Sequence, residues 1–151
     1  MRIQAIKHKT DEFKSFDEIQ TLVNRFEDAS LPRTQWTHRA HLTMACWYLI
    51  CHPESEAVRR IREGIKRYND SHGIVTSKDG GYHETITLFW IRMVHGYLAK
   101  TTLECPIVHL VNEMIARYSN KRLPFEFYSW ERLMSCEART NWLEPDLKHL
   151  G

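Results

Sequence analysis

Hydrophobic positions recur every three to four residues along most of this chain, which is the repeat of an α-helix with one buried face. The pattern covers five segments, at residues 15–29, 37–51, 54–68, 82–99 and 102–118. Ser15 and Glu18 form a capping box at the start of the first segment. Because no segment shows the alternating pattern of a β-strand, the sequence predicts an all-α fold.

The predicted helices differ in how much of their surface is apolar. Segment 37–51 is apolar almost all round, and segment 82–99 carries a broad apolar stripe, so we expect both helices to be buried. Segment 54–68 has a single apolar stripe, and its arginines and lysines occupy the other positions. It is therefore expected at the surface, with a solvated basic face rather than a nucleic-acid patch.

The helical repeat fails in the last part of the chain, but that part is not polar. Phe125 to Trp130 form an aromatic run, which indicates short turns that pack back on the helices. We expect a single helical domain over residues 1–151. Its main bundle of about five helices would span 13–119, and a short irregular segment would span 120–151.

Composition and charge limit the possible partners. The chain has 151 residues, of which 42% are hydrophobic and 26% charged, and this excludes collagen-like and extensively disordered proteins. The net charge of +2 is too small an excess of positive charge to indicate nucleic-acid binding. No apolar run approaches the roughly 20 residues of a membrane span, and no signal-like segment is visible at the start, so we expect a cytoplasmic protein. The four cysteines never form C-x-x-C, which favours reduced thiols.

Histidines near the starts of the two buried segments are the main candidates for chemistry. His38 and His41 lie three residues apart, about 60° around a helix axis, and can converge on one point. His83 shares the apolar face of its segment, and Glu84 follows it. A helix N-terminus disfavours imidazolium, and neutral imidazoles are what a divalent cation needs. We therefore expect a Zn, Fe, Ni or Mn site held by His38, His41 and His83, with Glu84 as a ligand or general base.

The same histidines also have a structural interpretation. Trp36 precedes the expected helix cap Thr37, so Trp36 and His41 can stack as a hydrophobic staple. His38 and His83 can each donate a hydrogen bond to a main-chain carbonyl. The sequence leaves the two interpretations open.

Further polar residues are candidates for binding a substrate. Tyr82 and Thr87 flank the His83-Glu84 pair. In the C-terminal segment, Arg139 can clamp an anionic substrate group, and Asp146 can orient a site histidine. Alternatively, Arg139 and Asp146 pair with each other or cap helix ends.

Several strings of this sequence resemble a family of small, uncharacterised bacterial all-helical proteins: W-T-H-R-A-H-L at 36–42, Y-H-E-T-I-T at 82–87, A-R at 138–139 and P-D-L at 145–147. The resemblance covers roughly residues 30–148 and implies that these strings belong together, without indicating a substrate. The pattern is also faintly similar to the helical HD-type metal phosphohydrolases, although here the doublet is His83-Glu84 rather than His-Asp.

The leading hypothesis is a small metal-dependent enzyme, hydrolytic or oxidative, that acts on a small molecule. No P-loop, G-x-S-x-G, H-E-x-x-H or dinucleotide motif is present, which argues against kinases, serine hydrolases, zincins and Rossmann enzymes. A second hypothesis is a non-catalytic module that receives an anionic or aromatic small ligand. A third is an interaction module, which pairs with a partner or forms a homodimer through its aromatic C-terminal segment.

Overall fold

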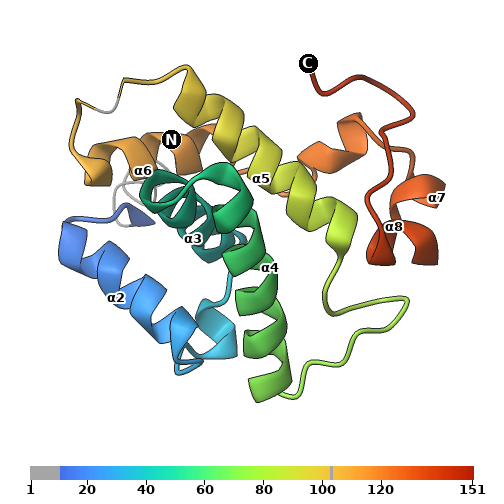
Figure 1. Cartoon of the computed structure of the whole chain (residues 1–151), viewed down its shortest axis with the longest axis horizontal. Helices are drawn as coiled ribbons and strands as arrows, with labels where there is room; N and C mark the ends of the chain where they lie inside the picture. The colour runs from blue at the N-terminus through green and yellow to red at the C-terminus, as the bar shows by residue number, and fades with distance from the viewer. Residues whose placement is uncertain (1–10, 103) are drawn as a thin grey trace, which may run out of the picture.

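The protein is described by a computed structural model over residues 11–102 and 104–151, and every regular element in this part of the chain is helical. Figure 1 shows the arrangement, whose α-helices are α2 (Phe16–Glu27), α3 (His38–Cys51), α4 (Glu54–Ser71), α5 (Glu84–Ala99), α6 (Ile107–Arg117), α7 (Trp130–Leu133) and α8 (Cys136–Thr140). Two 3-10 turns, η1 (Arg33–Gln35) and η2 (Leu123–Glu126), lie between them. The all-α prediction is confirmed, and the five long helices correspond to the five predicted segments.

The caps of the helices explain where they begin. Ser15 accepts a hydrogen bond from Glu18 N–H at the start of α2, and Thr37 accepts one from Ala40 N–H at the start of α3, as the sequence predicts. The predicted start of α6 at Thr102 is wrong. Thr102 accepts from Glu104 N–H in a local turn, and the helix begins only after Pro106.

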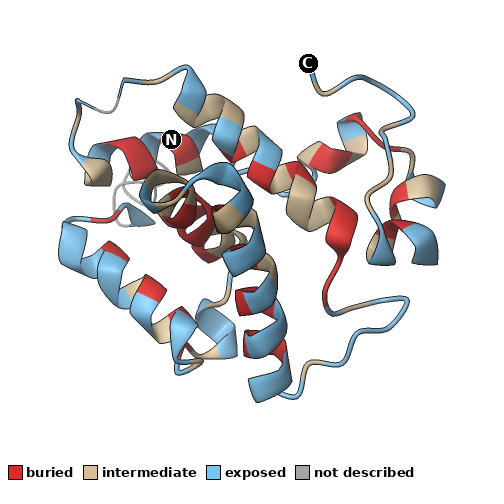
Figure 2. Ribbon diagram, in the orientation of Figure 1, coloured by how far each residue is buried: buried red, intermediate tan, exposed pale blue. Residues whose placement is uncertain are grey.

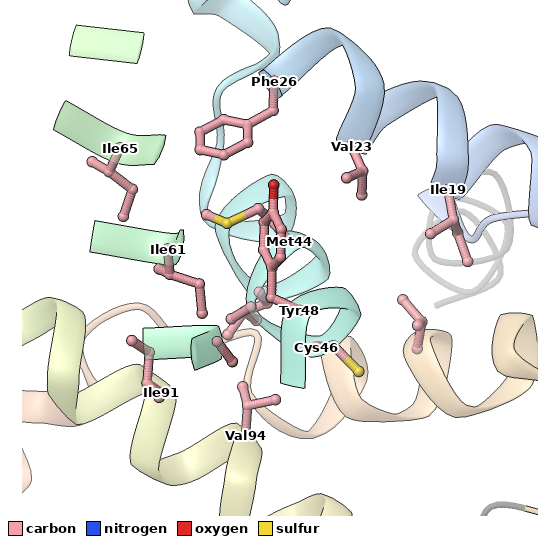
Figure 3. Packing of buried hydrophobic residues seen from close by; sticks show 14 of the residues in the cluster. Ile19, Val23, Phe26, Met44, Cys46, Tyr48, Ile61, Ile65, Ile91 and Val94 are labelled. Atoms are coloured by element: carbon pink, nitrogen blue, oxygen red, sulfur yellow. The ribbon is translucent and has the colours of Figure 1, made fainter. Parts of the chain in front are cut away.

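Helix α3 lies at the centre of the main bundle and packs against α2, α4, α5 and α6. Buried residues line the inner faces of these helices, while the outer face of α4 is exposed (Figure 2). Figure 3 shows the packing, in which Phe26, Met44 and Ile61 meet between α2, α3 and α4. Each of the three is about 1% exposed, so truncating any of them would leave a cavity.

The C-terminal segment folds back on α5, as its aromatic content predicts. Phe89 of α5 packs against Phe127, Tyr128 and Leu133 in a second buried cluster. The Tyr128 hydroxyl donates to Leu143 O at 2.7 Å, which ties the last residues to this cluster. The C-terminal segment therefore packs beside the first half of α5 and can form one wall of a site there.

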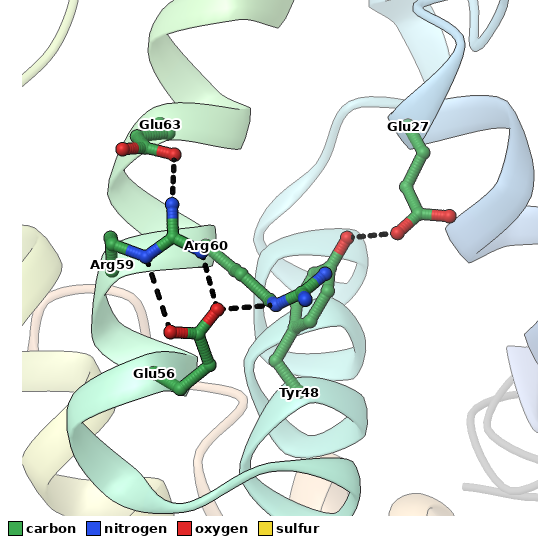
Figure 4. A network of polar contacts seen from close by, with 6 residues as sticks. All are labelled: Glu27, Tyr48, Glu56, Arg59, Arg60 and Glu63. Atoms are coloured by element: carbon green, nitrogen blue, oxygen red, sulfur yellow. Dashed lines mark hydrogen bonds and ion pairs between the residues drawn. The ribbon is translucent and has the colours of Figure 1, made fainter.

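Glutamates neutralise the basic outer face of α4. Glu56 accepts hydrogen bonds from both Arg59 and Arg60, and Glu63 pairs with Arg59 at 2.8 Å (Figure 4). Nearby, the Tyr48 hydroxyl donates to the Glu27 carboxylate (Figure 4). This face is a network of exposed (i, i+3) and (i, i+4) pairs.

No helix in residues 11–102 or 104–151 combines the length and the apolar character needed to cross a membrane.

Candidate functional site

A cavity with a volume of about 560 Å³ opens between α3, α4, α5 and the C-terminal segment. Its floor is apolar and includes Met44, Ile61 and Ile65. Two tryptophans, Trp36 and Trp90, also line it. The loop 73–82, which joins α4 to α5, contributes the wall nearest to solvent. The chamber therefore arises from the packing of elements that are far apart in the sequence.

The cavity collects most of the residues that the sequence singles out. Six of the eight candidate site residues line it, namely His38, His41, Tyr82, His83, Thr87 and Arg139. The other two, Glu84 and Asp146, do not. The structure therefore brings six of the predicted residues together around one cavity and decides what each side chain can do there.

His38 and His41 each have one nitrogen bound to the main chain and one that is free of the protein. His38 Nε2 donates to Tyr118 O at 2.8 Å, and His41 Nδ1 donates to Thr37 O at 2.7 Å. Because a carbonyl only accepts, these contacts define the tautomers of the neutral rings. His38 Nδ1 and His41 Nε2 are then acceptors, and neither has a hydrogen-bond partner within the described residues.

Both rings are held neutral by their surroundings. Burial lowers the pKa of His41 to about 4, against the raising effect of its bond to Thr37 O. Burial also lowers the pKa of His38, and the charge of Lys121 adds to this effect. His41 lies against Trp36 with ring centroids 3.7 Å apart, which is the staple that the sequence allows. His38 lies 4.7 Å from the ring of Trp90.

His83 caps a helix and has no nitrogen left for a ligand. Helix α5 begins at Glu84 rather than at Tyr82, and His83 Nδ1 accepts from Ile86 N–H at 3.1 Å. Its Nε2 donates to Leu133 O at 2.8 Å. Burial lowers the pKa of His83, and the charge of Arg139 acts in the same direction. The lone pair that a metal would need is used by the helix terminus.

This geometry does not support the three-histidine metal site. In the described part of the chain, no three His, Cys, Asp or Glu side chains are placed so that they could hold a metal ion together. Of the three predicted histidine ligands, His38 and His41 each keep one ring nitrogen without a protein partner in the described residues and His83 keeps none, whereas a zinc site usually takes at least three protein ligands. Helix periodicity places the imidazoles on inward faces, but it does not report which ring nitrogens the main chain already occupies.

Glu84 belongs to a polar cluster of its own beside the cavity. Its carboxylate accepts from the Tyr82 hydroxyl at 2.5 Å and pairs with Arg62 at 2.9 Å. Glu84 is only 8% exposed, so these two partners compensate its burial. Burial, together with the hydrogen bond to Glu84, raises the pKa of Tyr82. The described partners of Glu84 are therefore Tyr82 and Arg62, and neither is an expected metal ligand. Tyr82 lines the cavity, but its hydroxyl is already bound to Glu84.

Arg139 holds the loop 73–82 instead of standing free as an anion clamp. Its Nη1 donates to Gly80 O at 3.0 Å and to Tyr82 O at 3.2 Å, and its Nη2 donates to Lys78 O at 3.4 Å. Gly81, between these acceptors, has a φ of +85°. One guanidinium therefore fastens the cavity wall to α8 through charge-assisted hydrogen bonds.

Asp146 has no histidine partner among the residues that the structure describes. Its carboxylate accepts from Ser129 N–H at 2.8 Å, next to the start of α7. This contact lowers the pKa of Asp146 and resembles the capping role that the sequence allows as an alternative.

Sequence reasoning missed two features of the site. Trp90 and Lys121 line the cavity beside His38, but neither was singled out as a site residue. The apolar face of its helix explains Trp90 fully, and Lys121 follows α6 in a short connection with no motif. Lys121 lies near the site because Tyr118, three residues earlier, binds His38 of α3 through its main-chain carbonyl. This contact joins residues that are far apart in the sequence.

Within the described residues, fold and site together define an all-α protein with a ligand-sized chamber between its bundle and its C-terminal segment. Comparison of the chain with known protein families, with curated proteins and with solved structures finds no match.

Proposed function

We propose that this protein binds a small, largely apolar molecule that carries a hydrogen-bond donor. One observation carries the proposal: the cavity is apolar in its interior, yet it presents two acceptor nitrogens, His38 Nδ1 and His41 Nε2, that have no partner in the described residues. Neither nitrogen is fully buried, so water in the open cavity can reach both of them. A ligand donor would take the place of this water while the apolar body of the ligand covers the apolar walls.

The dimensions and walls of the cavity match such a ligand. A volume of about 560 Å³ lies within the range of small-molecule sites. Trp36 and Trp90 offer flat apolar surfaces, and Ile61 and Ile65 add aliphatic side chains to the lining. Thr87 adds a hydroxyl to the lining. An aromatic ligand of one or two fused rings fits this combination of surfaces.

The imidazoles are better suited to binding than to acid–base catalysis. A general base works best when its pKa lies near the working pH, whereas burial lowers the pKa of His41 to about 4. Such a ring accepts a hydrogen bond at neutral pH but takes up a proton poorly. Because His83 cannot complete a metal shell, the binding module is favoured over the metal-dependent enzyme.

The proposal is tested by calorimetric titration with 2-naphthamide, a neutral bicyclic probe whose amide N–H groups can reach an imidazole. The wild type should bind it, and Thr87→Trp, which places an indole ring inside the cavity, should weaken binding. Thr34→Trp is the matched control, because Thr34 is exposed and does not line the cavity. Absence of heat in the wild type, or equal binding by Thr87→Trp, would refute the proposal.

A further inference from the structure

The charged groups around the cavity are unevenly distributed. Three side chains with permanent charge line it at neutral pH, namely Asp79, Lys121 and Arg139. None of them forms an ion pair with any residue that the structure describes. The histidines add no charge, because burial keeps their rings neutral. The lining therefore has an excess of one positive charge.

The loop side of the cavity is balanced. Arg139 donates to the carbonyls of Lys78, Gly80 and Tyr82, which flank Asp79 in the chain. The guanidinium and the Asp79 carboxylate thus belong to the same wall, where their charges offset each other. The N–H groups of Arg139 that bind this wall are not available to a ligand.

Lys121 has no acidic partner among the residues that the structure describes. It lines the cavity and lies three residues after Tyr118, whose carbonyl binds His38 at 2.8 Å. Its positive charge acts on His38, where it adds to the lowering of the pKa of the ring. Lys121 is exposed, so its three N–H donors can meet an incoming ligand.

We propose that the ligand is a monoanionic, largely apolar acid: its carboxylate binds Lys121, its ring system lies between Trp36 and Trp90, and a hydroxyl or N–H group on the ring donates to a free imidazole nitrogen. This inference rests on the proposed function and specifies its ligand class. A carboxylate at the rim keeps part of its hydration and gains one cation, which avoids the cost of burying an ion. The apolar body supplies most of the affinity, and Lys121 supplies the selection for charge.

A matched pair of probes separates the inference from the function on which it rests. 6-Hydroxy-2-naphthoate and 6-hydroxy-2-naphthamide, called naphthoate and naphthamide below, share one ring system and one hydroxyl donor for the imidazole nitrogens, and they differ in charge. Both are titrated calorimetrically at low salt and neutral pH into wild type, Lys121→Met and Lys100→Met. Lys121→Met removes the charge and keeps an unbranched chain. Lys100 is exposed at the end of α5 and does not line the cavity, so Lys100→Met is the matched control.

We expect the wild type and Lys100→Met to bind naphthoate about fivefold more tightly than naphthamide, as a partly solvated ion pair allows. Lys121→Met should lose this preference while its affinity for naphthamide stays within about twofold of wild type. If naphthamide binds and naphthoate has no advantage, or if the advantage survives in Lys121→Met, the inference is wrong and the proposed function stands. If neither probe binds the wild type, both are wrong.

Discussion

Replacing His41 by phenylalanine should remove a large part of the pH dependence of stability below neutral pH. Phenylalanine keeps an aromatic ring against Trp36, which lies 3.7 Å from the imidazole. The substitution loses the bond from Nδ1 to Thr37 O, but that carbonyl still accepts from the main-chain N–H of residue 41 at 3.0 Å. The lost bond acts at every pH, so it does not alter a difference between two pH values.

The magnitude follows from the two protonation equilibria of the imidazole. In the unfolded chain the ring takes up a proton near its ordinary pKa of 6.5, whereas in the folded protein it does so only near 4. Between these values the unfolded state holds the extra proton, so the free energy of unfolding falls as the pH falls. For His41 alone, the loss between about pH 7.5 and about pH 4.5 amounts to about 2.5 kcal/mol. Above pH 6.5 the full stability is present.

Urea unfolding, followed by helical circular dichroism at these two pH values, measures the quantity directly. The pKa values of His38 and His83 are also lowered, so the wild type should lose more stability than His41 explains. The variant should lose about 2.5 kcal/mol less than the wild type over the same interval. His149→Phe, at an exposed position outside the cavity, controls for removal of a histidine. A His41→Phe variant with the pH dependence of the wild type would refute the reasoning.

Three further predictions concern the wall, the core and the metal. Arg139→Met should release the loop 73–82 from α8 and speed limited proteolysis of the loop several-fold, and Arg139→Lys should be cleaved at an intermediate rate. Equal cleavage of the wild type and both variants would show that Arg139 does not hold the loop. Gly64→Ala should lower the unfolding free energy by about 1–3 kcal/mol, because the new methyl group would lie 2.8 Å from the ring of Phe26; an unchanged urea midpoint would show that the ring moves at no cost. Untagged protein incubated with Zn²⁺ and desalted should retain no stoichiometric metal, whereas one bound ion that is lost in His38→Ala would restore the metal site.

Local physics explains why the helices could be predicted. The caps of α2 and α3 involve residues three positions apart, and the apolar stripes repeat with the helix turn, so both signals lie within short windows of sequence. The start of α5 was predicted two residues too early because a histidine, which is an uncommon N-cap, satisfies Ile86 N–H there. The aromatic C-terminal segment contributes Phe127, Tyr128 and Leu133 to a buried cluster with Phe89, because burying such side chains removes apolar surface from water.

The amino-acid sequence alone determined that this chain forms helices, which of them are buried, and that His38, His41 and His83 lie on inward faces. Only the tertiary structure decided what those rings can bind. His38 meets a carbonyl 80 residues away, and His83 meets one 50 residues away. A hydrogen-bond partner supplied by a distant turn leaves no trace in local periodicity. His41 and the cap formed by His83 use main-chain groups only three or four residues away, but the repeat of apolar positions does not report which ring nitrogen such a group occupies.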